Sequence, residues 1–235
     1  MSKLRILCLS VLSLLLTQKA YAQSGSDFWL WSDIGALVTL PDQTVSFSVV
    51  YRYIMDNDAS EYFLQAGSAL LSYRFPQTRF QIIGSYNVGE INDFGIVHLP
   101  QIQVRWDFSN ISWHPSIQFT YGRLTINTLT DMPAYATNHR FRVQVGMAPP
   151  LASFLTLIVN TEPFIKTRDG WWAEQRSIVG FDWKLHKSFH LRTFYFNRWV
   201  NDGVSRFRWN HALMLGMRFY INPPHLVHRN SPHNW

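Results

Sequence analysis

The sequence predicts an all-β chain folded as an antiparallel transmembrane β-barrel. Three observations support this fold class: apolar and polar residues alternate along most of the chain, most alternating segments exceed nine residues, and aromatic residues gather near segment ends. A strand needs about 9–11 residues to cross a bilayer, whereas strands of globular proteins average about 5–6. Hydrophobic residues make up 47% of the chain, yet its mean hydropathy is −0.09, which is typical of alternation.

The N-terminus has the features of a cleaved signal peptide. Lys3 and Arg5 precede an apolar run over residues 6–16, and this run is too short for a membrane-spanning helix, which takes about 20 residues. A small-x-small pattern then ends at Ala22. We therefore expect signal peptidase to cleave between Ala22 and Gln23, and we expect the protein to reach the bacterial outer membrane.

Charge and cysteine usage narrow the remaining possibilities. Cys8 is the only cysteine and lies within the signal peptide, so no disulfide is expected in the mature chain. The formal charge of +6 includes Lys3, Arg5 and Lys19, and no acidic residue precedes residue 23, so the mature chain carries +3. This charge is too small to indicate a nucleic-acid partner.

Three regions follow from these observations. Residues 1–22 form the signal peptide, residues 23–221 form the barrel, and residues 222–235 form a tail rich in proline and histidine. The tail includes His225, His228 and His233, but their spacing matches no closed metal site, and proline-rich tails are usually disordered. We expect neither a metal site nor a cofactor.

The barrel region divides into strand segments of period two. In chain order they are 27–40, 44–56, 61–75, 79–88, 97–108, 113–125, 139–147, 154–162, 174–185, 189–198 and 209–221. Bacterial single-chain barrels have an even number of strands, so we expect about twelve strands, with ten as the alternative. The segments 61–75 and 189–198 carry apolar residues on both faces.

The connections alternate between short and long. Short turns are expected at 41–43, 76–78, 109–112, 148–153 and 186–188, and longer loops at 89–96, 126–138, 163–173 and 199–208, with a short loop at 57–60. Membrane barrels have short periplasmic turns and longer external loops. A soluble lipocalin-like barrel would show the same alternation, but strand length, this rhythm and the aromatic residues favour the membrane barrel.

Residue alternation assigns each strand a lipid face and a lumen face. The apolar residues Phe47, Val104 and Val143 are expected to meet lipid, whereas Ser48, Gln103 and Gln144 are expected to meet the lumen. The aromatic residues near strand ends are expected at the water–lipid boundary; they are Phe28, Trp29, Trp31, Tyr51, Tyr53, Trp106, Trp113, Trp183 and Trp209.

Charged residues in the strands must face inward, because a charge on the lipid face near the bilayer midplane costs about 2–4 kcal/mol. The candidates for a lumen ion-pair network are Arg52, Asp56, Arg105, Asp107, Arg140, Arg142, Glu162, Arg176, Asp182 and Arg218. Within this set, Glu162 is the expected hub and Arg176 its expected partner, since Arg176 opens the next strand. These residues predict either an internal network that stabilises the barrel or a narrow path that prefers anions.

The final strand and several internal motifs resemble a known family. Met214-x-Gly216-x-x-Phe219-x-Ile221 has the spacing of a signal for the barrel-assembly machinery. The chain resembles the outer-membrane barrel family catalogued as domain of unknown function 2490. The matching residues are Trp31, Arg52, Asp56, the run Asn160-Thr161-Glu162-Pro163-Phe164, the run Glu174-Gln175-Arg176, Gly180 and His211. The resemblance implies the fold and the membrane, and it implies no activity.

An enzyme acting on lipid or lipopolysaccharide is the alternative function. Such chemistry would need a serine or histidine with an orienting partner, and the candidates are His98, His114, His139, His211, Ser68, Ser72, Ser85 and Ser116. Their spacing matches no lipase or deacylase signature, so the sequence favours a barrel without catalysis. The expected contacts are outer-membrane lipid and lipopolysaccharide, and the sequence indicates no particular oligomeric state.

Overall fold

A computed structural model describes residues 26–40, 42, 44–56, 61–93, 95–108, 110–128, 138–166, 172–201 and 207–221. The expected cleavage site at Ala22 and Gln23 and the tail over 222–235 lie outside these residues. The described chain forms only strands: β1 (Ser26–Thr39), β2 (Val45–Asp56), β3 (Glu61–Arg74), β4 (Phe80–Ile91), β5 (Gly95–Asp107), β6 (Ser116–Thr128), β7 (Asn138–Met147), β8 (Pro150–Ala152), β9 (Leu155–Lys166), β10 (Trp172–His186), β11 (Phe189–Asn201) and β12 (Phe207–Ile221). No helix in the described ranges is long and apolar enough to cross a membrane.

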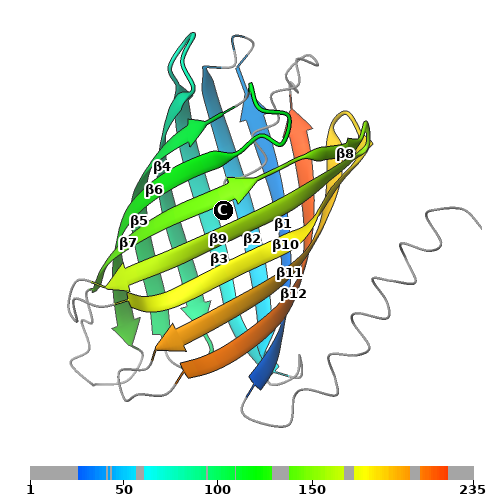
Figure 1. Ribbon diagram of the computed structural model, residues 1–235. Coiled ribbons are helices and arrows are strands. Elements are labelled where there is room, and N and C mark those ends of the chain that lie inside the picture. Colours follow the sequence, from blue (N-terminus) through cyan, green and yellow to red (C-terminus); the bar gives the residue numbers. More distant parts are fainter. Residues whose placement is uncertain are drawn as a thin grey trace, which may run out of the picture.

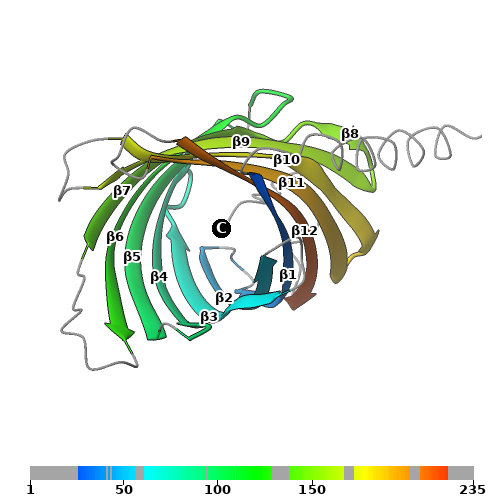
Figure 2. The ribbon, with the colours of Figure 1, turned by 90° about the horizontal axis from the view of Figure 1, so that it is seen from below.

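The strands close into a ring, which Figure 2 shows along its axis. The order is β10-β11-β12-β1-β2-β3-β4-β5-β6-β7-β9, and the pairing of β9 with β10 completes the circle. Neighbouring strands are antiparallel except at one seam, where β1 and β12 run parallel. The short β8 pairs only with β9 and continues the pairing of β7 along that strand, in line with β7 in Figure 1. The all-β barrel predicted from the sequence is confirmed.

The number of strands in the barrel wall is odd, whereas an even number was expected. In the described chain twelve strands are present, but eleven form the wall, because β8 has three residues and only extends the pairing of β9 beyond the end of β7. These eleven correspond to the eleven segments recognised in the sequence. When an odd number of strands alternates in direction, the first and last strand point the same way, so the ring can close only through a parallel seam.

The two faces of the wall follow the predicted alternation. Outward apolar side chains are exposed, for example Phe47 at 45%, whereas the adjacent Ser48 is 8% exposed and Gln103 on the inner face is 1% exposed. The prediction that Trp29 and Trp31 lie at the water–lipid boundary is wrong. Both are buried in the interior, because they share the inward face of β1 with Asp33, whose carboxylate pairs with arginines of the lumen.

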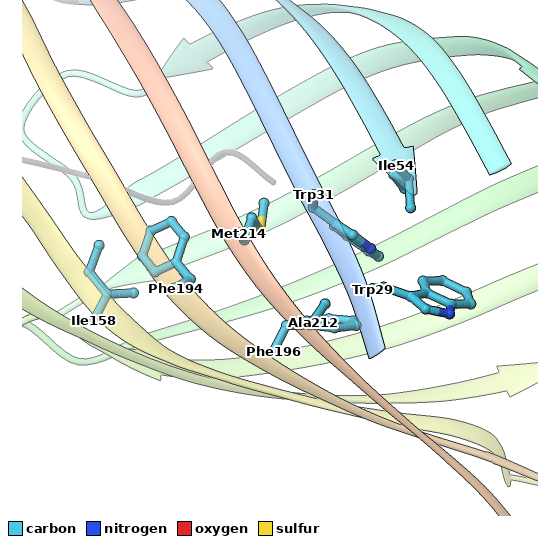
Figure 3. Close-up of a cluster of buried hydrophobic side chains, with 8 residues drawn as sticks. All are labelled: Trp29, Trp31, Ile54, Ile158, Phe194, Phe196, Ala212 and Met214. Carbon is cyan, nitrogen blue, oxygen red and sulfur yellow. The ribbon is translucent and has the colours of Figure 1, made fainter. Parts of the chain in front are cut away.

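An apolar cluster packs inside the barrel against one part of the wall. It joins strands β9, β11, β12, β1 and β2, as Figure 3 shows, and consists of Trp29, Trp31, Ile54, Ile158, Phe194, Phe196, Ala212 and Met214. Phe194 and Phe196 come from one of the two segments that carry apolar residues on both faces. The cluster therefore explains why the alternation is weak in β11: both of its faces meet apolar surroundings.

The connections between strands define two ends of the barrel. We call the end where β2 joins β3, β4 joins β5, β6 joins β7, β9 joins β10 and β11 joins β12 the loop end, and the opposite end the turn end. Several strands run on into segments predicted as loops, so the connection between β4 and β5 spans 92–94 instead of 89–96, and that between β9 and β10 spans 167–171 instead of 163–173. The longest loop-end connection is 129–137.

The face assignment leads to a labelling prediction. In a protein that lacks Cys8, single cysteines are introduced and labelled with a fluorophore. A quencher confined to lipid should quench the fluorophore at Phe47 and Val143, but not at Ser48 and Gln144. The reason is that consecutive residues of a strand point to opposite faces of the sheet. Fluorophore quenching in reconstituted vesicles measures this difference. Equal quenching within each adjacent pair would contradict the register.

Candidate functional site

The lumen is the candidate site, because charged side chains from most wall strands converge there. Nine arginines and five carboxylates lie on the described inward face: Arg52, Arg74, Arg105, Arg140, Arg142, Arg176, Arg192, Arg198 and Arg218, with Asp33, Asp107, Glu162, Glu174 and Asp182. Of the sequence candidates, Asp56 belongs to none of the groups described below; it is the last residue of β2 and faces Glu61 in the register. The other candidates join groups at three positions in the lumen.

The first group lies near the loop end, and we call it the loop-end cluster: Arg140, Arg142, Glu162, Glu174, Arg176 and Arg198. Glu174 binds two guanidinium groups. Arg198 Nε lies 2.7 Å from Glu174 Oε1 and its Nη2 lies 3.2 Å from Oε2, and Arg176 Nε pairs with the same Oε1. Glu174, which the ion-pair prediction omitted, is therefore the main carboxylate of this cluster.

The predicted partner of Glu162 needs correction. Glu162 and Arg176 are register partners on β9 and β10, as expected from their positions. The carboxylate of Glu162, however, pairs with Arg142 on β7, with Oε1 at 3.0 Å from Nη1. Glu174 lies two residues from Arg176 on the same face of β10 and binds its guanidinium. Glu162 consequently pairs with a residue of β7, on the other edge of β9.

Aromatic rings also contact the guanidinium groups of this cluster. Arg176 lies 4.1 Å from the ring centroid of Phe164, and Arg142 lies 5.2 Å from the same ring. Arg198 lies 5.5 Å from the ring of Trp29. Arginine stacks well on aromatic faces because its charge is delocalised over a weakly hydrated plane.

The loop-end cluster has more cationic than anionic groups. Its four arginines face two glutamates, and Arg140 is the arginine without a carboxylate among the described ion pairs. Its Nε is buried and has no hydrogen-bond partner in the described structure. The cluster therefore presents net positive charge to the lumen.

The second group joins the two strands of the parallel seam, and we call it the seam cluster: Asp33, Arg52 and Arg218. The side chain of Asp33 is 0% exposed, and its oxygens lie 3.0 and 3.3 Å from Arg218 and 3.4 Å from Arg52. In the register, Asp33 faces Gly216 and Gly35 faces Arg218. A Cβ at Gly216 would overlap the Asp33 carboxylate, so each glycine leaves room for the charged side chain opposite.

A third set of ion pairs lies toward the turn end. Asp182 binds His190 Nδ1 at 2.7 Å and Arg192 Nε at 2.8 Å, and Arg192 also donates to the Tyr220 hydroxyl at 3.1 Å. On the other side of the barrel, Asp107 accepts from Arg105 Nε at 2.7 Å and lies 3.5 Å from Arg74. Carboxylates and arginines are more evenly matched here than at the loop end.

Between these groups, an uncharged polar surface covers the inner face of β4 to β7. We call it the amide belt: Asn87, Gln101, Gln103, Gln118 and Gln144. Gln118 Nε2 donates to Gln103 Oε1 at 3.0 Å, and Gln103 Nε2 donates to Ser85 at 3.4 Å. The belt lies across the ring from the apolar cluster on β9, β11, β12, β1 and β2. The apolar side chains thus gather on one side of the ring and the uncharged amides on the other, while the charged groups lie at several positions around it.

Five charged lumen residues were missed, mostly because their segments were hard to orient from the sequence: Asp33, Arg74, Glu174, Arg192 and Arg198. Asp33 and Arg198 lie in strands with apolar residues on the inward face, where a lone charge does not identify the lumen side. Glu174 could have been found from Arg176, because residues two positions apart in a strand share a face.

The candidate catalytic residues are not assembled into a catalytic arrangement. Ser68, Ser72 and Ser85 bond to Asn87, Ser46 and Gln101 in the lumen. His98, His139 and His211 bond to tyrosines on the outer face instead. Among the described residues, no group of three or more histidine, cysteine or acidic side chains could hold a metal ion.

Comparisons with known proteins give a structural match. No protein-family model matches the chain, and no curated protein matches it. A solved structure described as the NanC porin in a rhombohedral crystal form is similar, with a TM-score of 0.50 and 9% sequence identity, over 80% of this chain and 99% of the porin chain. At this identity the similarity concerns the fold alone, and the chain shares the β-barrel fold of a porin.

Proposed function

We propose that this protein is a narrow, anion-preferring channel of the bacterial outer membrane. The observation that carries the proposal is the excess of guanidinium groups in the loop-end cluster, where four arginines face two glutamates. A lumen with low-dielectric walls concentrates the field of such charges, so it attracts small anions and repels cations.

The interior supports a narrow path. Barrels of about 8 strands leave no channel and those of about 16 leave a wide one, and this wall has eleven strands. The apolar cluster occupies part of the lumen on the side of β9 to β2, so in this proposal solutes pass nearer the amide belt.

The outer surface and the sequence support the location. Large apolar side chains are exposed on strands around the ring, including Leu71, Ile102, Phe119 and Leu215, and such a surface is stable in lipid. The signal peptide expected at residues 1–22 supports export, and the spacing of β12 supports insertion by the barrel-assembly machinery. Membership in the family catalogued as domain of unknown function 2490 is part of this proposal.

Conductance tests the proposal directly. In planar bilayers with a potassium chloride gradient, the purified protein should show small conductance steps and a reversal potential of the sign given by chloride. Arg140→Gln should lower the chloride-to-potassium permeability ratio roughly two- to threefold, because it removes a cation that forms no ion pair among the described residues. Arg123→Gln is the matched control, since Arg123 is exposed on the outer face and should not alter the ratio.

Two results would contradict the channel. A reversal potential of the potassium sign would exclude an anion preference. A complete lack of conductance in a folded, reconstituted protein would instead indicate a closed barrel, in which the charged groups serve stability alone.

A further inference from the structure

A repeated pair of residues marks the outer surface of the barrel. Three times a tyrosine hydroxyl hydrogen-bonds to Nδ1 of a histidine on the next strand: Tyr86 with His98 at 2.7 Å, Tyr121 with His139 at 2.6 Å, and Tyr195 with His211. The ring centroids are 6.2, 5.8 and 5.9 Å apart, in the same order. We call these the Tyr–His pairs.

The three pairs have the same place in the fold. The tyrosines lie on β4, β6 and β11, which run toward the loop end, and the histidines lie near the start of β5, β7 and β12. Each tyrosine faces the residue two positions after its histidine: Pro100, Phe141 and Leu213. The histidine is therefore always one outward position nearer the loop end.

The Tyr121–His139 pair lies where the apolar outer face of β6 is followed by the polar residues Arg123, Thr125 and Asn127. On β7 the outward positions that follow His139 toward the turn end are Phe141, Val143 and Val145, and on β12 those after His211 include Leu213 and Leu215. A ring with a polar edge at the limit of an apolar band lies at the depth of lipid headgroups.

One pair carries an additional cation. Arg123 is the register partner of His139, is exposed, and lies two residues beyond Tyr121 on the same face of β6. Cross-strand partners have Cβ atoms about 4.5–5.5 Å apart, so the guanidinium, the imidazole and the phenol occupy one small surface. Among the described residues, no carboxylate forms an ion pair with Arg123.

The direction of the hydrogen bond between Tyr121 and His139 decides which group the imidazole presents. When the Tyr121 hydroxyl donates to Nδ1, the neutral ring carries its proton on Nε2, and the protonated ring carries one there as well. In this arrangement Nε2–H is a donor beside the five N–H groups of the Arg123 guanidinium. Such a group of donors matches the oxygens of a phosphate.

We propose that Tyr121, Arg123 and His139 bind a phosphate group of a lipid in the leaflet at the loop end, of the phosphomonoester type carried by lipid A. The acyl chains would lie along the outward apolar residues below, such as Phe141 and Val143, and the phosphate would meet the donors at the boundary. The inference rests on the proposed place of the barrel in an outer membrane, but not on conduction.

The other pairs provide a matched comparison. Tyr86 and His98 have the same hydrogen bond, but the register partner of His98 is Val88, where His139 has Arg123. An apolar side chain at this position offers no positive charge to a phosphate. His98 therefore shares the geometry of His139 without its charge environment.

Binding of lipid A to the reconstituted protein tests the site. In phosphatidylcholine nanodiscs, the protein should bind phosphorylated lipid A about tenfold more tightly than the same lipid A after removal of its phosphates, which is the usual strength of charge-assisted hydrogen bonds. Arg123→Gln should abolish this preference, and His139→Phe should reduce it. His98→Phe and Arg79→Gln, an exposed arginine near the turn end, should keep it.

Several outcomes would overturn the proposal. Equal binding of both forms of lipid A would do so, as would an unchanged preference in both Arg123→Gln and His139→Phe, or an equal loss in Arg79→Gln. Phosphatidylglycerol bound as tightly as lipid A would indicate general attraction to anionic lipid instead. Folding is checked for each variant by its heat-dependent gel mobility. The channel proposal is judged separately from the reversal potential, which Arg123→Gln leaves unchanged.

Discussion

Asp33→Asn is expected to lower the free energy of unfolding by about 3–5 kcal/mol, the cost of removing one partner from a buried ion pair. Asp33 is the carboxylate of the seam cluster, with a side chain that is 0% exposed and oxygens 3.0 and 3.3 Å from Arg218. An asparagine can accept hydrogen bonds, but it cannot neutralise Arg218 and Arg52. The effect should be large because the seam joins the first and the last strand of the wall, β1 and β12.

Double substitution separates the ion pair from other effects. Arg218→Met combined with Asp33→Asn should cost clearly less than the sum of the two single changes, because the second change removes the unbalanced charge that the first creates. Equilibrium unfolding in urea, followed by tryptophan fluorescence in micelles, measures these energies. Asp42→Asn, in the exposed turn before β2, is the control and should change stability by no more than about 0.5 kcal/mol. Strictly additive losses would show that the pair is not coupled.

Glu174→Gln is expected to have two effects at once. It removes the carboxylate that binds both Arg176 and Arg198, whose side chains are 21% and 23% exposed. Because the guanidinium groups are partly solvated, the loss of stability should be about 2–3 kcal/mol, below the cost for a fully buried pair. The loop-end cluster also loses a negative charge, so the chloride-to-potassium permeability ratio should rise.

The combination distinguishes the two roles of the loop-end cluster. Unfolding in urea gives the first effect and the reversal potential gives the second. Glu90→Gln is the matched control, since Glu90 is exposed on the outer face and should alter neither quantity. A loss of stability without conductance in either protein would favour a purely structural network. If stability falls while the permeability ratio stays constant, Glu174 does not act on the permeating ions.

The orientation of single side chains was predictable wherever one face of a strand was uniformly apolar. Gln103 and Gln144 are buried in the lumen, as expected, and Val145 lies on the exposed face. The period of a strand is two, so a few unambiguous residues fix the direction of all their neighbours. Trp29 and Trp31 were placed wrongly, because β1 carries apolar residues on both faces and its period alone could not distinguish lipid from the internal apolar cluster.

Pairing between charged residues was predictable only in part. The positions of Glu162 and Arg176 in adjacent strands correctly indicate that they lie opposite each other. The choice of Arg142 over Arg176 depends on a competing carboxylate, Glu174, and on a third strand. Sequence spacing describes one strand pair at a time, whereas a carboxylate in a lumen can turn to either neighbour.

The sequence by itself determined that this chain is a barrel, which residues form its eleven wall strands, and which of their faces is polar. Each of these features depends on local periodicity and strand length, which one segment contains in full. Only the tertiary structure decided how the barrel closes. The parallel seam between β1 and β12 brings Asp33 to Gly216 and Arg218, residues far apart in the chain. Closure depends on the summed direction and stagger of all the strands, and that sum is a property of the complete ring.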